Sequence, residues 1–119
     1  MPRSRRSLGA EVEDRVASYL IEAGLTVITR RRHAKGGELD LVCIEGDLLV
    51  FVEVKSRTGG AAEEAFTERK AGRVRTAARA YLAEMGIPDR PYRIDLVAVE
   101  GDAIRHHRDV ELTDRGSDA

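Results

Sequence analysis

Two carboxylates and a lysine, Asp40, Glu53 and Lys55, lie in two neighbouring apolar segments of the chain. Hard divalent cations such as Mg²⁺ take oxygen ligands, often one or two carboxylates together with water and phosphate oxygens. The bound metal lowers the pKa of a water molecule and stabilises negative charge on a phosphoryl oxygen. A lysine beside it would position that water or stabilise the developing charge. These residue types therefore indicate hydrolysis of a phosphodiester bond.

A tight turn brings these residues together. Gly46-Asp47 separates the segments 38–45 and 48–55, which predicts a two-residue β-hairpin because glycine reaches positive φ without steric cost. In that hairpin Asp40 faces Glu53, and like charges directly opposed destabilise a sheet. Side chains alternate along a strand, so one face would carry all the charged groups, Glu38, Asp40, Glu53 and Lys55. A cation between the two acids would remove the repulsion.

The same charges also have a structural interpretation. Lys55 or a nearby arginine could neutralise Asp40 and Glu53 as a plain ion-paired cluster, because charged clusters mark sites only statistically. Glu38, at the start of its strand, either supports the site or is simply exposed. The adjacent pair His106-His107 is not predicted to bind one metal ion, because neighbouring residues of a strand point to opposite faces.

The composition favours a single folded domain over residues 8–112, with a basic arm over 1–7 and a polar tail over 113–119. The chain has 119 residues, of which 42% are hydrophobic and 34% charged, which argues against disorder. No apolar run approaches the roughly 20 residues of a membrane span, so no membrane partner is expected. The single cysteine, Cys43, cannot form an internal disulfide, and this favours a cytoplasmic protein.

The hydrophobic periodicity predicts an α/β fold with the order α-β-β-β-α-β-β. Both hairpin strands are apolar on both faces, which is typical of central, covered strands. A polar loop is expected over residues 32–37, before the first hairpin strand. The expected elements are a helix over 8–23 with Ser7 as its N-cap, strands over 25–31, 38–45 and 48–55, a helix over 67–85, and strands over 92–100 and 103–108.

Basic residues cluster next to the acidic pair although the net charge is only −1. Two groups are candidate phosphate ligands. One is the basic run at the predicted loop, and the other is a lysine in the first turn of the second helix. These nucleic-acid candidates are Arg30, Arg31, Arg32, Lys35 and Lys70. A solvated basic face and a surface lysine are the alternatives. Aromatic residues make up only 4% of the chain and none lies among the basic runs, so base stacking is not expected.

The segment Gly37-Glu38-Leu39-Asp40-Leu41, followed by Phe51-Val52-Glu53-Val54-Lys55, resembles the core of the PD-(D/E)xK nuclease superfamily. More closely, the chain resembles the YraN-like family of small bacterial proteins, whose fold is related to archaeal Holliday junction resolvases. The resemblance covers most of residues 8–99. The proline that gives the superfamily pattern its name is absent, and Glu38-Leu39 precedes the aspartate as in the resolvase-like branch.

The resemblance implies a restriction endonuclease-like core, with a central mixed sheet flanked by helices. It also implies Mg²⁺ or Mn²⁺ as cofactor, bound by Asp40, Glu53 and the backbone carbonyl of Val54. Lys55 would be the catalytic lysine, and Glu13 on the first helix would complete the acidic cluster.

The expected function is a metal-dependent endonuclease acting on structured, branched DNA, with DNA favoured over RNA. A chain this small has no evident room for a separate sequence-reading module, and a homodimer would place two sites for paired cuts. The alternative is a noncatalytic nucleic-acid-binding or adaptor protein that keeps the nuclease fold. It predicts salt-sensitive DNA binding that survives Asp40→Asn.

Overall fold

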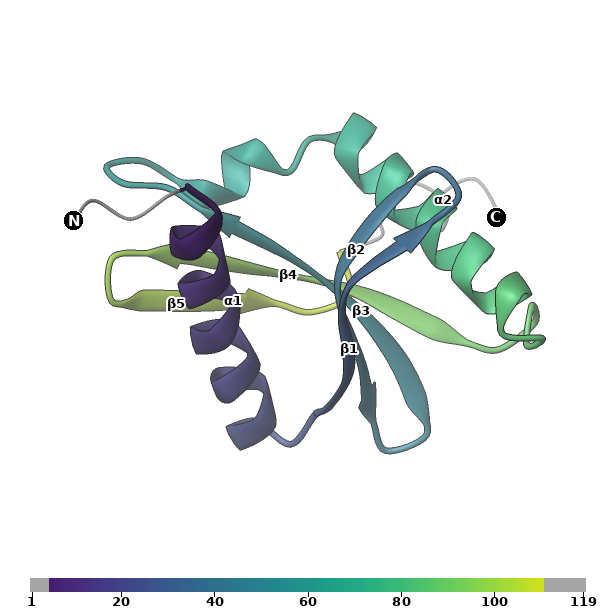
Figure 1. The fold of residues 1–119 in the computed structure, drawn as a ribbon. Helices are drawn as coiled ribbons and strands as arrows, with labels where there is room; N and C mark the ends of the chain where they lie inside the picture. Colours follow the sequence, from purple (N-terminus) through teal and green to yellow (C-terminus); the bar gives the residue numbers. More distant parts are fainter. Residues whose placement is uncertain (1–4, 111–119) are drawn as a thin grey trace.

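Five strands form one mixed sheet with a helix against each face (Figure 1). The computed structural model describes the backbone of residues 5–110 and the side chains of residues 9–110. The elements in chain order are α1 (Arg5–Glu22), β1 (Thr26–Ala34), β2 (Gly37–Glu45), β3 (Leu48–Ser56), the 3-10 helix η1 (Ala62–Ala65), α2 (Glu68–Glu84), β4 (Tyr92–Glu100) and β5 (Ala103–His107). The predicted α/β fold and its order are confirmed, with η1 as an additional short element.

The strands lie in the order β1-β2-β3-β4-β5. Only β3 and β4 are parallel, and α2 makes the crossover between them, as parallel neighbours require. Each helix buries one apolar stripe. Val16 and Leu20 of α1 pack on one face of the sheet, while Ala78 and Leu82 of α2 pack on the other. Side chains of β2 and β3 enter both cores, as their two-sided apolar pattern predicts.

The ends of the two helices were predicted with different success. The Thr67 hydroxyl accepts a hydrogen bond from the Lys70 N–H at 3.3 Å, so Thr67 is the N-cap and α2 begins one residue after the predicted start. In contrast, α1 begins at Arg5, and Ser7 lies inside the helix, so its prediction as N-cap is wrong. Arginine is a good helix former, which allows the extra turn. Neither helix of the described chain is long and apolar enough to span a membrane.

The prediction of a polar loop over residues 32–37 is wrong. β1 continues to Ala34, which pairs with Gly37 across a two-residue turn. Gly36 of that turn has a φ of 99°, and a Cβ there would lie 2.6 Å from Thr76 Cγ2 on α2. Any side chain would therefore strain the backbone and clash with α2. The charged residues that suggested a loop belong to an edge strand, where solvent reaches the side chains.

A kink crosses β1 and β2 at the position of Arg31 and Asp40. The residues on either side of Arg31 pair with the residues on either side of Asp40. Arg31 has a φ of 49°, in the left-handed region that arginine rarely adopts. Leu39 packs under α2 but Leu41 packs under α1, although residues two apart in a regular strand share a face. The kink therefore moves Asp40 out of the regular alternation.

The hairpin between β2 and β3 has the predicted register near its turn, with Val42 opposite Phe51. Its last paired position joins Leu41 to Val52, so the ladder ends just before Asp40. The two strands separate at this point. The opening in the sheet is where the predicted site residues gather.

Candidate metal and nucleic-acid site

The carboxylates of Asp40 and Glu53 meet where β2 and β3 separate. They share a hydrogen bond, and the Val54 N–H donates a second one to Asp40 Oδ2 at 2.8 Å. Glu53 is only 9% exposed, and Lys55 Nζ lies 3.1 Å from Glu53 Oε2. The structure therefore brings together the acid pair and the lysine that were predicted from the sequence.

Burial and the neighbouring acid raise the pKa of Asp40 from its usual 3.8 to about 7. Removal from water is the largest cause, followed by the charge of Glu53 and the hydrogen bond between the two acids. The Val54 N–H and the Lys55 ammonium act in the opposite direction but are too weak to compensate. The pair thus holds a proton near neutral pH.

Two hollows open on opposite faces of the sheet at this point. The first, of about 280 Å³, lies beneath α1 and is lined by Glu13, Asp40 and Ser56, with Gly9 at its edge. We call it the acidic hollow. The second, of about 220 Å³, lies beneath α2, and we call it the basic hollow. Its charged lining residues are Glu38, Glu53, Lys55, Lys70 and Arg73.

The predicted sharing of one face is correct for three of the four charged residues. Glu38, Glu53 and Lys55 line the basic hollow, so Glu38 lies at the site. The prediction is wrong for Asp40, which lines the acidic hollow because the kink turns it toward α1. Asp40 and Glu53 still interact because they approach each other through the gap between the strands.

Glu13 reaches the acidic hollow but is bound to another partner. Arg31 Nε donates to Glu13 Oε2 at 2.8 Å, and the Glu13 side chain is only 14% exposed. The guanidinium also lies against Gly9, where a Cβ would be 3.6 Å from Arg31 Nη2. Arg31 therefore crosses between α1 and the kinked strand, next to Asp40.

A divalent metal ion fits the acid pair through a small number of protein ligands. Asp40 and Glu53 offer the one or two carboxylates with which Mg²⁺ is commonly held beside water and phosphate oxygens. Within the described residues, no three His, Cys, Asp or Glu side chains are gathered to hold a metal ion. Glu13 is thus not part of a preformed three-ligand site, and the Val54 carbonyl as a ligand stays a prediction.

The arginines of the basic run do not form one continuous patch. Arg30 pairs with Asp14 of α1, and Arg31 pairs with Glu13. A third arginine, Arg32, lies 2.8 Å from Glu84 and 5.5 Å above the Tyr81 ring, both on α2. Lys35, at the turn, is exposed and forms no ion pair with a described residue. Three of the four basic residues thus tie β1 to the helices.

The basic hollow holds a second group of cations closer to the acids. Lys70 projects into it from the first turn of α2, next to Lys55. Arg73, which was not among the predicted nucleic-acid residues, lines the same hollow. Its spacing of three residues from Lys70 is the signal that could have revealed it, because such residues share a helix face. Neither side chain forms an ion pair with a described residue.

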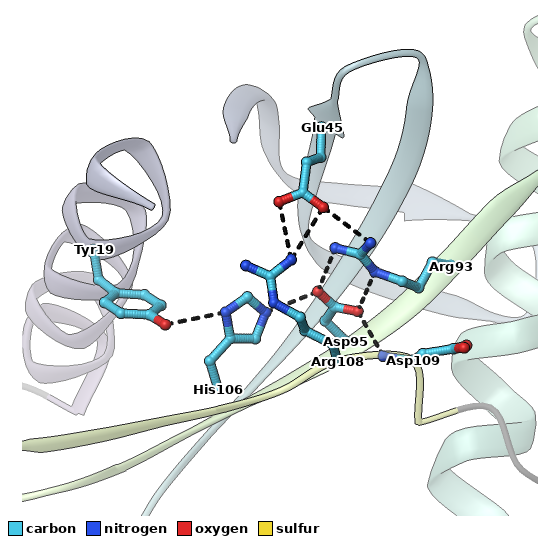
Figure 2. A network of polar contacts seen from close by, with 7 residues as sticks. All are labelled: Tyr19, Glu45, Arg93, Asp95, His106, Arg108 and Asp109. Carbon is cyan, nitrogen blue, oxygen red and sulfur yellow. Dashed lines mark hydrogen bonds and ion pairs between the residues drawn. The ribbon is translucent and has the colours of Figure 1, made fainter. Parts of the chain in front are cut away.

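A second buried carboxylate, Asp95 on β4, lies in a polar network that the sequence did not reveal (Figure 2). His106 Nε2 donates to it at 2.8 Å, Arg93 Nε donates at 2.8 Å, and the Asp109 N–H donates at 2.9 Å. Tyr19 of α1 lies 3.2 Å from the other ring nitrogen of His106. Burial alone would raise the pKa of Asp95, but the hydrogen bonds outweigh it and lower the pKa.

The adjacent histidines contact separate acids, as the alternation of a strand predicts. His106 contacts Asp95, while His107 Nε2 lies 2.7 Å from Glu63 Oε2 on η1. The two imidazole rings thus have different partners, on different elements of the fold.

The model of Uncharacterised protein family UPF0102 matches residues 12–99. The chain belongs to this family. A UPF0102 protein of Pelotomaculum thermopropionicum is 43% identical over 102 residues, which cover 83% of this chain and 85% of the relative. A UPF0102 protein of Cupriavidus taiwanensis is 42% identical over 122 residues, with 96% and 92% covered. The matched segment of the UPF0102 model contains both the acid pair and the cations of the basic hollow.

Proposed function

We propose that this UPF0102 protein is a Mg²⁺- or Mn²⁺-dependent endonuclease that hydrolyses phosphodiester bonds of structured DNA. One observation carries the proposal. Asp40 and Glu53 meet at an opening in the sheet, with Lys55 Nζ 3.1 Å from the Glu53 carboxylate. Similarity to the resolvase-like branch of the PD-(D/E)xK nucleases supports the same function.

The residues that line the two hollows would have different roles in the reaction. Asp40 and Glu53 would hold the metal, which lowers the pKa of a water and stabilises phosphoryl charge when bound. Lys55, held beside Glu53, would orient the attacking water or stabilise the developing charge. Lys70 and Arg73, both without an ion-pair partner among the described residues, would hold a neighbouring phosphate of the backbone.

The basic side chains suit contacts with the phosphates of a nucleic acid rather than with its bases. Among the described residues no aromatic side chain lines either hollow, which argues against stacking of the bases. The exposed Lys35 at the turn and the cations of the basic hollow favour a substrate recognised by its shape. Branched DNA is such a substrate, and a homodimer would place two sites for paired cuts.

Cleavage of branched and linear DNA with Mn²⁺ tests the proposal. The wild type should cut at least one of these substrates, and Glu53→Gln should reduce the rate by about 100-fold or more, because it removes a metal ligand without changing the side-chain volume. Glu22→Gln is the matched control, since Glu22 is exposed near the opposite end of α1. The proposal fails if the wild type cuts none of the substrates, or if both variants cut as well as the wild type.

One observation favours a noncatalytic nucleic-acid-binding adaptor instead. Glu13 is ion-paired with Arg31, and no three-ligand metal cluster exists in the described part of the chain. The adaptor predicts salt-sensitive DNA binding without cleavage. It also predicts that Asp40→Asn leaves DNA affinity unchanged with or without Mn²⁺. A metal-dependent gain in affinity that Asp40→Asn abolishes would exclude it.

A further inference from the structure

Among the described residues, Arg31 is the one arginine of the basic run that pairs with a residue lining the acidic hollow, namely Glu13. Its Nε donates to Glu13 at 2.8 Å, and its guanidinium feels the charges of Asp40 and Glu38 as well. Glu13 is the acid that contacts the guanidinium, and Asp40 and Glu38 attract it more weakly. The guanidinium charge is thus fixed beside an acid that lines the same hollow as Asp40.

The backbone at Arg31 is unfavourable for the residue that occupies it. A φ of 49° costs an ordinary side chain about 1 kcal/mol or more, and asparagine or glycine would tolerate it better. Such a conformation persists only when surrounding contacts hold it. The contacts that hold Arg31 are those with Glu13 and Gly9 of α1. The side chain is thus aimed at the acids by both the kink and the helix.

We propose that Arg31 is an internal counterion that holds Glu13 away from the acid pair, so that a divalent metal must displace the guanidinium to complete its site. This inference rests on the proposed metal site and adds a positioning residue to it. Glu13 lines the same hollow as Asp40, so a released carboxylate would face the space that Asp40 also faces. Competition between an arginine and a metal for one carboxylate then sets the metal affinity.

The test is a calorimetric titration of the intact protein with Mn²⁺. Arg31→Asn removes the guanidinium and suits the backbone at this position, and Arg31→Gly does the same without a side chain. Both should bind Mn²⁺ about tenfold more tightly than the wild type, because an opposing charge and one ion pair no longer have to be overcome. Thermal unfolding of each variant shows that it is folded.

Two further variants separate charge from structure. Arg31→Lys keeps a positive charge and the strained backbone, so its Mn²⁺ affinity should stay within about threefold of the wild type. Arg30→Asn removes a neighbouring charge of β1 that pairs with the exposed Asp14, and it should change the affinity by less than about twofold. A purely structural role of Arg31 would weaken metal binding in the Asn, Gly and Lys variants alike.

The outcomes separate this inference from the proposed function. Equal or weaker Mn²⁺ binding by folded Arg31→Asn and Arg31→Gly, with a wild type that binds, overturns the counterion role alone. Absence of binding in the wild type and in both variants overturns the metal site and the counterion role together. Binding that appears only when Arg31 is replaced supports both.

Discussion

The two buried carboxylates of the sheet, Asp40 and Asp95, have opposite environments. Asp95 accepts hydrogen bonds from His106, from Arg93 and from a backbone N–H, and its pKa is lowered although no part of it is exposed (Figure 2). Asp40 accepts from one backbone N–H, and its other partner is a second acid. Its pKa rises to about 7.

The difference shows which acid is part of the scaffold and which has capacity for a ligand. Asp95 has cationic and backbone partners for both oxygens, so nothing further is required at that position. Asp40 lacks an ion-pair partner of its own among the described residues, because Lys55 contacts Glu53. Buried acids without such partners hold a proton or a metal ion instead.

The largest expected loss of folding stability comes from a substitution that breaks the Asp95 network. Asp95→Asn leaves the buried His106 without its anion and removes one of the two anions of Arg93, which keeps Glu45, and removing one partner of a buried ion pair costs about 3–5 kcal/mol. Asp40→Asn, the matched substitution at the other acid, should be neutral or stabilising at pH 8. Urea unfolding measures both. Equal losses in the two variants would contradict the comparison.

The next effect is the pH dependence of stability that Asp40 causes. Between its usual pKa of 3.8 and its folded pKa of about 7, the folded state holds more protons than the unfolded state. The Asp40 contribution is therefore fully present below pH 4 and is lost as the pH rises through 7, on the order of 4 kcal/mol. Unfolding of the wild type and Asp40→Asn from pH 4 to 8 measures it. A slope equal in both proteins would show that Asp40 is not its source.

The position of the acid pair was predictable because its determinants are local. Gly46-Asp47 fixes the hairpin turn, and the register follows by counting from it. The α2 cap at Thr67 is likewise encoded within a few residues. Each of these features depends on neighbours in the sequence.

The separation into two hollows was not predictable from local patterns. It depends on the kink at Arg31, which α1 holds through Glu13, 18 residues earlier in the chain. The partners of Asp95 are also distant or have no periodic signal, such as Tyr19 beside His106. Long-range pairing of charged residues leaves little trace in hydrophobic periodicity.

Metal binding should sharpen the contrast between the two acids. At a concentration 100 times its dissociation constant, Mn²⁺ should stabilise the wild type by about 2.7 kcal/mol, because it binds only the folded state. The gain should be larger at pH 8 than at pH 6, since the metal competes with the proton on the acid pair. Thermal unfolding with and without Mn²⁺ measures this. An equal gain in Glu53→Gln would place the metal elsewhere.

The smallest expected effect lies at the edge of the Asp95 network. Tyr19→Phe removes one hydrogen bond to His106 and keeps the ring, so it should cost about 1 kcal/mol. The Mn²⁺ affinity should be unchanged, since this network is separate from the acid pair. Urea unfolding and a Mn²⁺ titration of the same variant measure the two quantities. A change in metal affinity would show that the two regions are coupled.

The most direct test of the central claim is a calorimetric titration with Mn²⁺ at pH 8, carried out on the wild type, on Asp40→Asn and on Glu22→Gln. The account predicts saturable binding in the wild type and in Glu22→Gln, and its loss in Asp40→Asn. Absence of saturable binding in the wild type and in Arg31→Asn alike, or equal binding in the wild type and Asp40→Asn, would contradict the assignment of the Asp40–Glu53 pair as a metal site.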